Sequence, residues 1–161
     1  MLFYPLPLNN SISATTTDCV MTSIQSNPSL LQNLAAQTVI VTGGANGIGA
    51  CTVRHCYLHG ANVVIADLPS AHLEATTLIA SLPDPSRALF IPVNIVVWAE
   101  LRALFSTAVG QFGRVDIVIA NAGVMESRDF FDFQIDDEGQ LTEDLSVAKV
   151  IDVNLKGAMN S

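Results

Sequence analysis

Four short apolar runs restrict the possible folds of this chain more than any other feature. They are rich in Val and Ile and nearly continuous rather than alternating, which is typical of strands buried on both faces of a parallel sheet. The runs are Thr38–Thr42, Asn62–Ala66, Ala88–Val93 and Val115–Ala120. The residues between and after them favour helices over Ala50–His59, Ser70–Ser81, Trp98–Phe112 and about Glu143–Asn160. This alternation predicts right-handed crossovers and a doubly wound α/β domain.

Composition narrows the class of protein further. Half of the 161 residues are apolar and 14% are charged, which suits one domain with a core and excludes a disordered chain. The net charge of −8, with only seven Lys and Arg, argues against nucleic acid as a partner. No apolar run approaches the roughly 20 residues of a membrane span, so we expect no membrane contact. The three cysteines do not form a disulfide framework, which favours a reducing, cytoplasmic location.

The N-terminal stretch differs from the rest of the chain. Residues 1–36 carry a single charge, Asp18, and show neither helical nor strand periodicity. We therefore predict a disordered or loosely attached tail over residues 1–36 and a domain over residues 37–161. Met21 is a second candidate start, a hypothesis that N-terminal sequencing beginning at Met1 would refute.

A glycine-rich turn follows the first predicted strand and opens a helix. Its sequence is Thr42-Gly43-Gly44-Ala45-Asn46-Gly47-Ile48-Gly49. Glycines there let the backbone turn sharply and approach a ligand, and the free N–H groups of the helix then face an anion such as a pyrophosphate. The alternative is an ordinary glycine-rich connection between a strand and a helix.

An acidic residue in the right place favours dinucleotide binding. Asp67 ends the second strand 18 residues after Gly49, where a carboxylate can bind both hydroxyls of an adenosine ribose. A simple Asx turn at Asp67-Leu68-Pro69 is the alternative. A carboxylate there repels a 2′-phosphate, and Asn46 and Leu68 stand where a basic residue would accept one. The sequence therefore predicts NAD rather than NADP.

Three linked motifs resemble the short-chain dehydrogenase/reductase family. They are Thr-Gly-x-x-x-Gly-x-Gly at 42–49, Asn-Ala-Gly at 121–123 and Val-Asn-Leu-Lys-Gly at 153–157. The resemblance implies a Rossmann-like sheet with strand order 3-2-1-4. It also implies that the cofactor contacts Gly43, Asn46, Gly47, Ile48, Gly49, Asp67, Leu68, Asn94, Ile95, Asn121, Ala122 and Gly123. Asn94 stands where the family usually has Asp, although an amide can still bind an adenine edge.

Asn154 is the one catalytic residue of the family that this sequence matches. It lies on an apolar helix face with Val147, Val150, Ile151 and Ala158, so its amide needs partners. It could tie neighbouring backbone together or order water in an active site. The resemblance implies the second role, in a proton relay.

The family's central catalytic pair is missing from these residues. The resemblance implies hydride transfer between nicotinamide and an alcohol or carbonyl carbon. It also implies a Tyr as general acid and base, a Lys in a Tyr-x-x-x-Lys pair that lowers the pKa of the Tyr, and a Ser that polarises the substrate oxygen. The Ser and the pair are expected beyond these residues. The only tyrosines are Tyr4 and Tyr57, and Ala61 stands where Tyr57 would need Lys. We therefore expect the cofactor-binding half of an NAD-dependent oxidoreductase, inactive by itself. A small-molecule substrate and a homo-oligomer are expected only for a complete protein. The alternatives are an inactive nucleotide-binding module and a truncated gene product.

Two remaining features receive structural interpretations. Eight of the fifteen acids lie between Glu126 and Asp144, around Phe130, Phe131 and Phe133, which favours a solvated loop over a binding surface. His55 and His59 lie four residues apart on a predicted helix but lack a third ligand, so packing or capping is favoured and no metal site is predicted.

Overall fold

A computed structural model describes residues 34–125, 135–142 and 145–161 of the chain. Its centre is a four-stranded sheet in the order β3-β2-β1-β4, with every neighbouring pair parallel. The strands are β1 Thr38–Thr42, β2 Asn62–Asp67, β3 Ala88–Pro92 and β4 Ile117–Ile119. The predicted sheet type and strand order are therefore confirmed.

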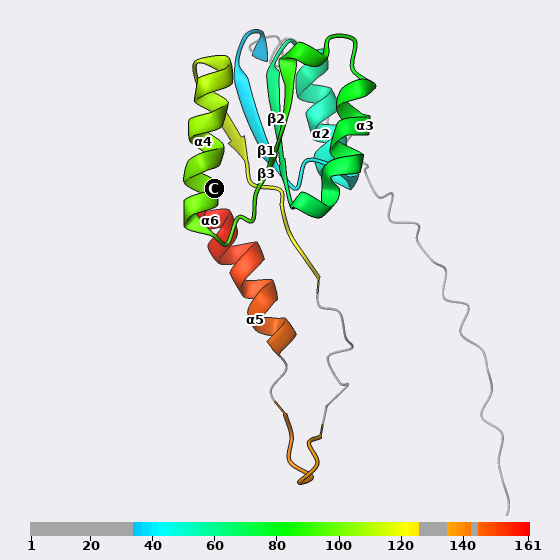
Figure 1. The fold of residues 1–161 in the computed structure, drawn as a ribbon, viewed down its shortest axis with the longest axis vertical. Helices are drawn as coiled ribbons and strands as arrows, with labels where there is room; N and C mark the ends of the chain where they lie inside the picture. The colour runs from blue at the N-terminus through cyan, green and yellow to red at the C-terminus, as the bar shows by residue number, and fades with distance from the viewer. Residues whose placement is uncertain (1–33, 126–134, 143–144) are drawn as a thin grey trace, which may run out of the picture.

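Helices cover both faces of the sheet (Figure 1). Helices α2 and α3 lie on one face and α4 on the other (Figure 1). The bounds are α2 Gly47–Leu58, α3 His72–Ala80 and α4 Trp98–Phe112, with short 3-10 turns at Pro69–Ala71 and Pro85–Arg87. The last helical stretch consists of α5 Leu145–Ile151, a π-helical turn Asp152–Gly157 and α6 Ala158–Asn160.

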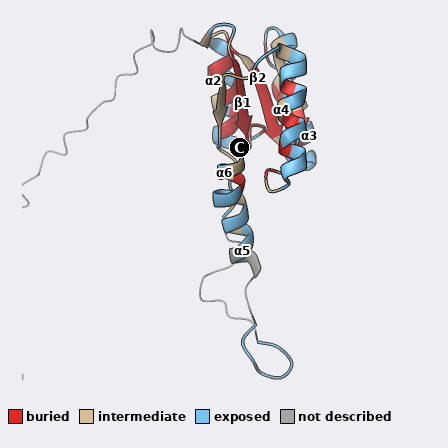
Figure 2. Cartoon of the chain, turned by 90° about the vertical axis from the view of Figure 1, so that its left-hand side faces the viewer, coloured by how far each residue is buried: buried red, intermediate tan, exposed pale blue. Residues whose placement is uncertain are grey.

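The central strands separate two apolar cores. Val39 and Val41 of β1 pack with α2 and α3, whereas Ile40 between them packs with Leu101 and Leu104 of α4. This follows from the alternation of side chains along a strand. Every residue of β1 and residues 63–66 of β2 are buried, and these two strands form the buried centre of the molecule (Figure 2). The continuous apolar runs are thus explained by burial on both faces.

Several element boundaries differ from the predicted ones, including those of α2 and β4. Helix α2 begins at Gly47 rather than Ala50, so the last glycines of the turn lie in its first turn. Strand β4 covers only Ile117–Ile119. Asp116, just before it, bonds to the Thr38 backbone through its side chain as well as through its own N–H. The Asp116 carboxylate accepts a hydrogen bond from the Thr38 N–H at 2.8 Å and pairs with Arg114, and these contacts lower the pKa of Asp116.

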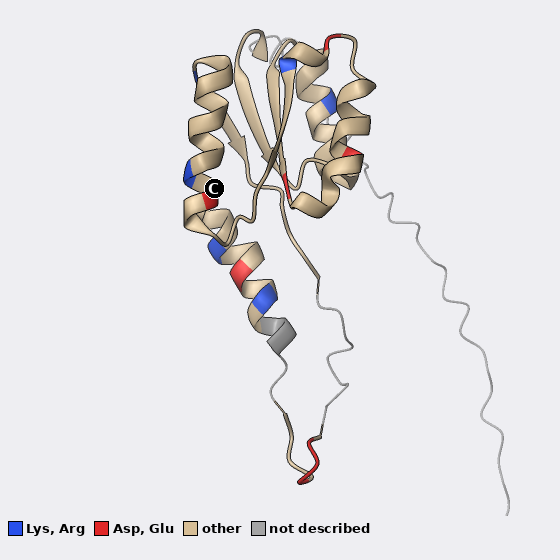
Figure 3. Ribbon diagram, viewed as in Figure 1, with Lys and Arg blue, Asp and Glu red and all other residues tan. Residues whose placement is uncertain are grey.

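The chain segments outside the sheet and helices are described only in part. Residues 135–142 are exposed, with an antiparallel bridge between Ile135 and Leu141 and acids at the tip (Figure 3). The predicted anchors Phe130, Phe131 and Phe133 lie outside the described residues. Within the predicted tail, Leu34 packs on the core and the Ala36 N–H donates to the Gly60 carbonyl at 3.0 Å. Among the described helices, none is long and apolar enough to cross a membrane.

Candidate functional site

The carboxyl ends of the four parallel strands meet at one edge of the sheet, and a cavity of about 510 Å³ opens there. Its walls come from the residues after each strand and from the last helical stretch. The lining residues are Gly43, Ala66, Asp67, Leu68, Val93, Asn94, Ile95, Val96, Ala122, Gly123, Val124, Ala148, Lys149, Asp152 and Val153. Ligands of open α/β sheets bind in this position, where the strand order reverses.

The glycine turn is held tightly against the rest of this edge. Gly43 has a φ of +64°, and a Cβ there would lie 2.8 Å from the Ala122 Cα. A Cβ on Gly49 would lie 2.0 Å from the Gly43 carbonyl oxygen. Glycine is therefore required at both positions for space, and at Gly43 for conformation as well.

The N-terminus of α2 keeps free hydrogen-bond donors. The N–H groups of Gly47, Ile48 and Gly49 bond to no other described residue, and the Asn46 side chain does not cap the helix. Unpaired N–H groups at a helix start, together with the helix dipole, attract an anion. The predicted anion-binding turn therefore has the donors that it needs.

Asp67 is the last residue of β2 and lines the cavity. One carboxylate oxygen accepts the Ala45 N–H at 3.0 Å, and the other accepts the Leu68 N–H at 2.8 Å. The carboxylate thus ties the glycine turn to the end of β2. An ionised carboxylate has about four acceptor positions, so it can still accept further hydrogen bonds from a ligand.

Asn94 has only part of its amide in use. Its Oδ1 accepts the Val96 N–H at 3.1 Å in an Asx turn, and its own backbone N–H donates to the Glu100 carboxylate at 2.7 Å. Its Nδ2 has no hydrogen-bond partner within the described part of the chain. The side chain therefore presents a free donor from a residue that lines the cavity.

Asn121 braces the two central strands rather than lining the cavity. Its Nδ2 donates to the carbonyls of Thr42 and Gly43 at 3.0 and 3.2 Å. The Thr42 hydroxyl in turn accepts the N–H groups of Asn121 and Ala122 at 3.1 and 3.2 Å. These bonds fix the glycine turn relative to the turn after β4.

Asn154 lies in the π-helical turn behind Gly123 and Val124. Its Oδ1 accepts the Val124 N–H and its Nδ2 donates to the Val124 carbonyl, each at 2.8 Å. The amide thus binds both polar groups of one backbone residue. The sequence left open whether Asn154 ties neighbouring backbone together or orders water, and these two hydrogen bonds tie the backbone of Val124 to the last helical stretch.

The structure brings together some, but not all, of the predicted cofactor residues. Gly43, Asp67, Leu68, Asn94, Ile95, Ala122 and Gly123 line the cavity. Asn46 and Gly47 instead line a second hollow of about 440 Å³ between α2 and α3. Ile48, Gly49 and Asn121 line neither, and Ile48 is 80% exposed.

Sequence reasoning missed the contribution of the last helical stretch to the cavity. Lys149, Asp152 and Val153 all line it. Their spacing of i, i+3 and i+4 puts them on one helix face, and that spacing was the signal available in the sequence. The face carries one cation and one anion, and charges of both signs alternate along this stretch (Figure 3).

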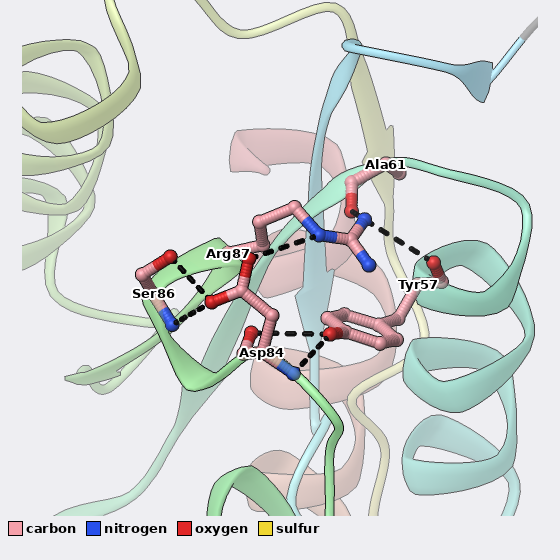
Figure 4. Close-up of polar contacts among 5 residues, drawn as sticks. All are labelled: Tyr57, Ala61, Asp84, Ser86 and Arg87. Carbon is pink, nitrogen blue, oxygen red and sulfur yellow. Dashed lines mark hydrogen bonds and ion pairs between the residues drawn. The ribbon is translucent and has the colours of Figure 1, made fainter.

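The one described tyrosine lies far from this cavity. Tyr57 lies in the last turn of α2, at the opposite edge of the sheet, and only 2% of it is exposed. Its hydroxyl accepts the Asp84 N–H at 2.7 Å and donates to the Asp84 carbonyl at 3.1 Å (Figure 4). The Arg87 guanidinium lies 3.9 Å above the ring and donates to the Ala61 carbonyl at 3.0 Å. Hydrogen bonds from Ser86 lower the pKa of Asp84. Tyr57 is therefore a structural residue.

The two histidines of α2 also have local partners. The His59 Nδ1 lies 2.8 Å from the His55 carbonyl, and the two ring centres are 4.5 Å apart. The described residues contain no group of three His, Cys, Asp or Glu side chains that could hold a metal ion.

Comparisons with known proteins agree with this geometry. The family model for short chain dehydrogenases matches residues 37–161. A short-chain dehydrogenase/reductase of Penicillium roqueforti is 35% identical over 140 residues, covering 86% of this chain and 38% of that protein. One from Acremonium egyptiacum is 36% identical over 139 residues, covering 86% and 44%.

A solved structure shares the fold. The 3-ketoacyl-(acyl-carrier-protein) reductase from Brucella melitensis, complexed with NADH, superimposes with a TM-score of 0.64 at 25% identity, covering 79% of this chain and 47% of that one. The fold and its cleft define a Rossmann-like protein of the NAD(P)-binding class. The chain belongs to the short-chain dehydrogenase family, and it spans less than half the length of these relatives.

Proposed function

We propose that this chain provides the cofactor-binding half of an NAD-dependent oxidoreductase that transfers hydride between nicotinamide and an alcohol or carbonyl carbon. One observation supports the cofactor choice above all others. Asp67 lines the cavity at the end of β2, next to the glycine turn that it holds. A carboxylate there accepts hydrogen bonds from ribose hydroxyls and repels a 2′-phosphate. When bound, the cofactor supplies the hydride acceptor or donor.

The contacts of the cofactor follow from the same geometry. The free N–H groups of Gly47, Ile48 and Gly49 would hold the pyrophosphate. Asp67 would hold the adenosine ribose beside Leu68, and the free Nδ2 of Asn94 would donate to an adenine nitrogen next to Ile95. Gly43, Ala122 and Gly123 would let the cofactor approach the backbone.

The cofactor assignment is tested by calorimetry. We expect the chain to bind NADH more tightly than NADPH. Asp67→Asn should weaken NADH binding and reduce the difference between the NADH and NADPH affinities. Asp152→Asn removes a carboxylate from the same cavity without touching the end of β2, so it controls for a general charge effect. Tighter binding of NADPH by the unaltered chain, or equal effects of the two substitutions, would contradict the assignment.

These 161 residues are proposed to bind the cofactor without turning it over. Tyr57 is committed to the Asp84 backbone, and no Tyr-x-x-x-Lys pair occurs in the sequence. Purified chain incubated with NAD and a panel of alcohols should therefore produce no NADH. Turnover that Asn154→Ala abolishes would overturn this. Absence of folded protein would favour a truncated gene product, and NADH binding without turnover fits the binding half or an inactive module.

For Asn154 we propose a positioning role in addition to the water-ordering role that the resemblance implies. Its amide bonds to both backbone polar groups of Val124, which itself lines the cavity. Asn154→Ala should speed hydrogen exchange at the Val124 amide and weaken NADH binding, whereas Asn154→Asp keeps the acceptor and should do less. Faster exchange with unchanged NADH affinity would restrict Asn154 to a structural role.

The cellular setting is also a proposal. Cys51 and Cys56 are free thiols in the structure, which fits a reducing, cytoplasmic location. A homo-oligomer acting on a small-molecule substrate is proposed for the complete protein. Cell fractionation and light scattering of purified protein test the two points.

A further inference from the structure

Among the described residues that line the main cavity, Lys149 is the only Lys or Arg. Two described carboxylates, Asp67 and Asp152, line the same cavity. This described lining therefore carries more negative than positive formal charge, in a chain whose net charge is already −8. A ligand that carries phosphates is repelled by such a surface unless a local cation compensates.

The ammonium group of Lys149 is available to a ligand. Lys149 is exposed and forms no ion pair within the described part of the chain. Lys156, the other cation of the last helical stretch, lies 3.9 Å from the Asp152 carboxylate. Lys156 thus already has an anionic partner and does not line the cavity, whereas Lys149 lines it without one.

The position of Lys149 in the fold places it on the outer side of the cavity. It belongs to α5, the part of the last helical stretch that extends away from the sheet (Figure 1). Asp67 and Gly43, in contrast, lie at the ends of β2 and β1 in the body of the molecule. The cavity therefore has the exposed Lys149 on the wall that α5 supplies and the strand ends on the opposite wall.

We propose that Lys149 is the docking cation of this cleft, which attracts the phosphate groups of an incoming dinucleotide and holds them during entry. The inference rests on the proposed function and adds a residue that none of the three sequence motifs contains. A charge at the rim of a binding site changes the association rate and its salt dependence more than the strength of the final contacts.

The test is stopped-flow binding of NADH, followed by NADH fluorescence. At low ionic strength, Lys149→Gln should slow association by about three- to tenfold, with little change in the dissociation rate. Lys149→Arg keeps the charge and should retain most of the rate. Lys156→Gln is the comparison variant, because it removes a cation of the same helical stretch that does not line the cavity and is already paired with Asp152; it should slow association less than Lys149→Gln. Above about 0.5 M salt the variants should converge, because screening is then nearly complete.

Fragments of the cofactor with and without phosphate distinguish an effect of charge from a change in the shape of the site. Adenosine carries no phosphate, so Lys149→Gln should leave its affinity unchanged, whereas ADP-ribose should follow NADH. Equal rates for Lys149→Gln and Lys156→Gln, or a loss that persists at high salt, would overturn the proposal.

Failure of the proposed function gives a different result. If the chain binds ADP-ribose but not NADH, the proposed nicotinamide cofactor is wrong. The role of Lys149 is then still tested by the effect of Lys149→Gln on ADP-ribose binding. If folded chain binds neither ligand, both proposals are wrong.

Discussion

Two threonines of β1 are equally buried but differ in what they contribute to stability. Thr38 and Thr42 are 0% and 1% exposed. The Thr38 hydroxyl has no hydrogen-bond partner in the described part of the chain, whereas the Thr42 hydroxyl accepts two N–H groups from the turn after β4. Burying a hydroxyl without a partner is unfavourable, while a satisfied one stabilises the fold.

The same substitution should therefore have opposite effects at the two ends of this strand. Thr38→Val keeps the shape and removes the unpaired hydroxyl, so we expect the free energy of unfolding to rise by about 1 kcal/mol. Thr42→Val removes the acceptor of the Ala122 N–H, while the Asn121 N–H keeps the Ile119 carbonyl at 2.9 Å, and the substitution should lower it by about 1–3 kcal/mol. Urea unfolding measures both, and a stabilising Thr42→Val would contradict the hydrogen bonds described.

The glycine turn offers a second matched pair. A Cβ on Gly49 would lie 2.0 Å from the Gly43 carbonyl oxygen, whereas a Cβ on Gly47 would meet nothing within 4 Å. Gly49→Ala should therefore destabilise the fold by about 3 kcal/mol. Gly47→Ala should cost only about 1 kcal/mol, because its φ is +53°. Equal losses in urea unfolding would contradict the steric argument for Gly49, whose φ is not positive.

At the scale of elements, local patterns were sufficient for regular structure and insufficient for side-chain partnerships. Continuous Val- and Ile-rich runs predicted the strands, and the apolar stripe of Trp98–Phe112 predicted α4 with its observed bounds. The π-helical turn around Asn154 was not predicted, because the motif at 153–157 does not distinguish a π-helical turn from an α-helical one. Nor did any local pattern reveal Tyr57 as a partner of Asp84, since 27 residues separate them.

The pairing of Tyr57 with Asp84 connects α2 to the turn before β3. Tyr57→Phe keeps the ring under Arg87 but removes the hydroxyl that bonds to both backbone groups of Asp84. We expect the free energy of unfolding to fall by about 1–2 kcal/mol. NADH affinity should not change, because Tyr57 lies at the opposite edge of the sheet from the cavity. A weaker NADH affinity in calorimetry, with stability intact, would contradict this division.

For the whole molecule, the apolar runs predicted a parallel sheet, and the resemblance to the family predicted its strand order and the edge at which a ligand would bind. It did not predict which side chains from the last helical stretch close the cavity. Lys149 and Asp152 lie more than 80 residues along the chain from the Asp67 carboxylate, and only the packing of that stretch brings them to one cavity. The absence of a side chain at Gly157 allows this packing, because a Cβ there would lie 2.6 Å from the Cδ1 of Ile95.

The acid sensitivity of the fold follows from two carboxylates. The Thr38 N–H and Arg114 lower the pKa of Asp116, and Ser86 lowers that of Asp84, both from an ordinary value of 3.8. Their contribution to stability is therefore complete above about pH 4 and is lost as the pH falls through the lowered values.

Unfolding in urea between pH 6 and pH 2 should show this loss. Asp116→Asn should lower stability at pH 6 and make the acid dependence shallower. Asp137→Asn removes an exposed carboxylate from residues 135–142 and serves as the control. An unchanged acid dependence in Asp116→Asn would show that this carboxylate does not contribute.

The cluster of Tyr57, Asp84 and Arg87 has a consequence for how such a domain can change. The contacts among Tyr57, Asp84 and Arg87 lie at one end of the sheet, whereas the other end has the cavity and free backbone donors. Substitutions that strengthen the first end can therefore accumulate without altering what the second end recognises. Substitutions in the cavity can equally change which ligand binds there while the contacts of Tyr57, Asp84 and Arg87 stay the same.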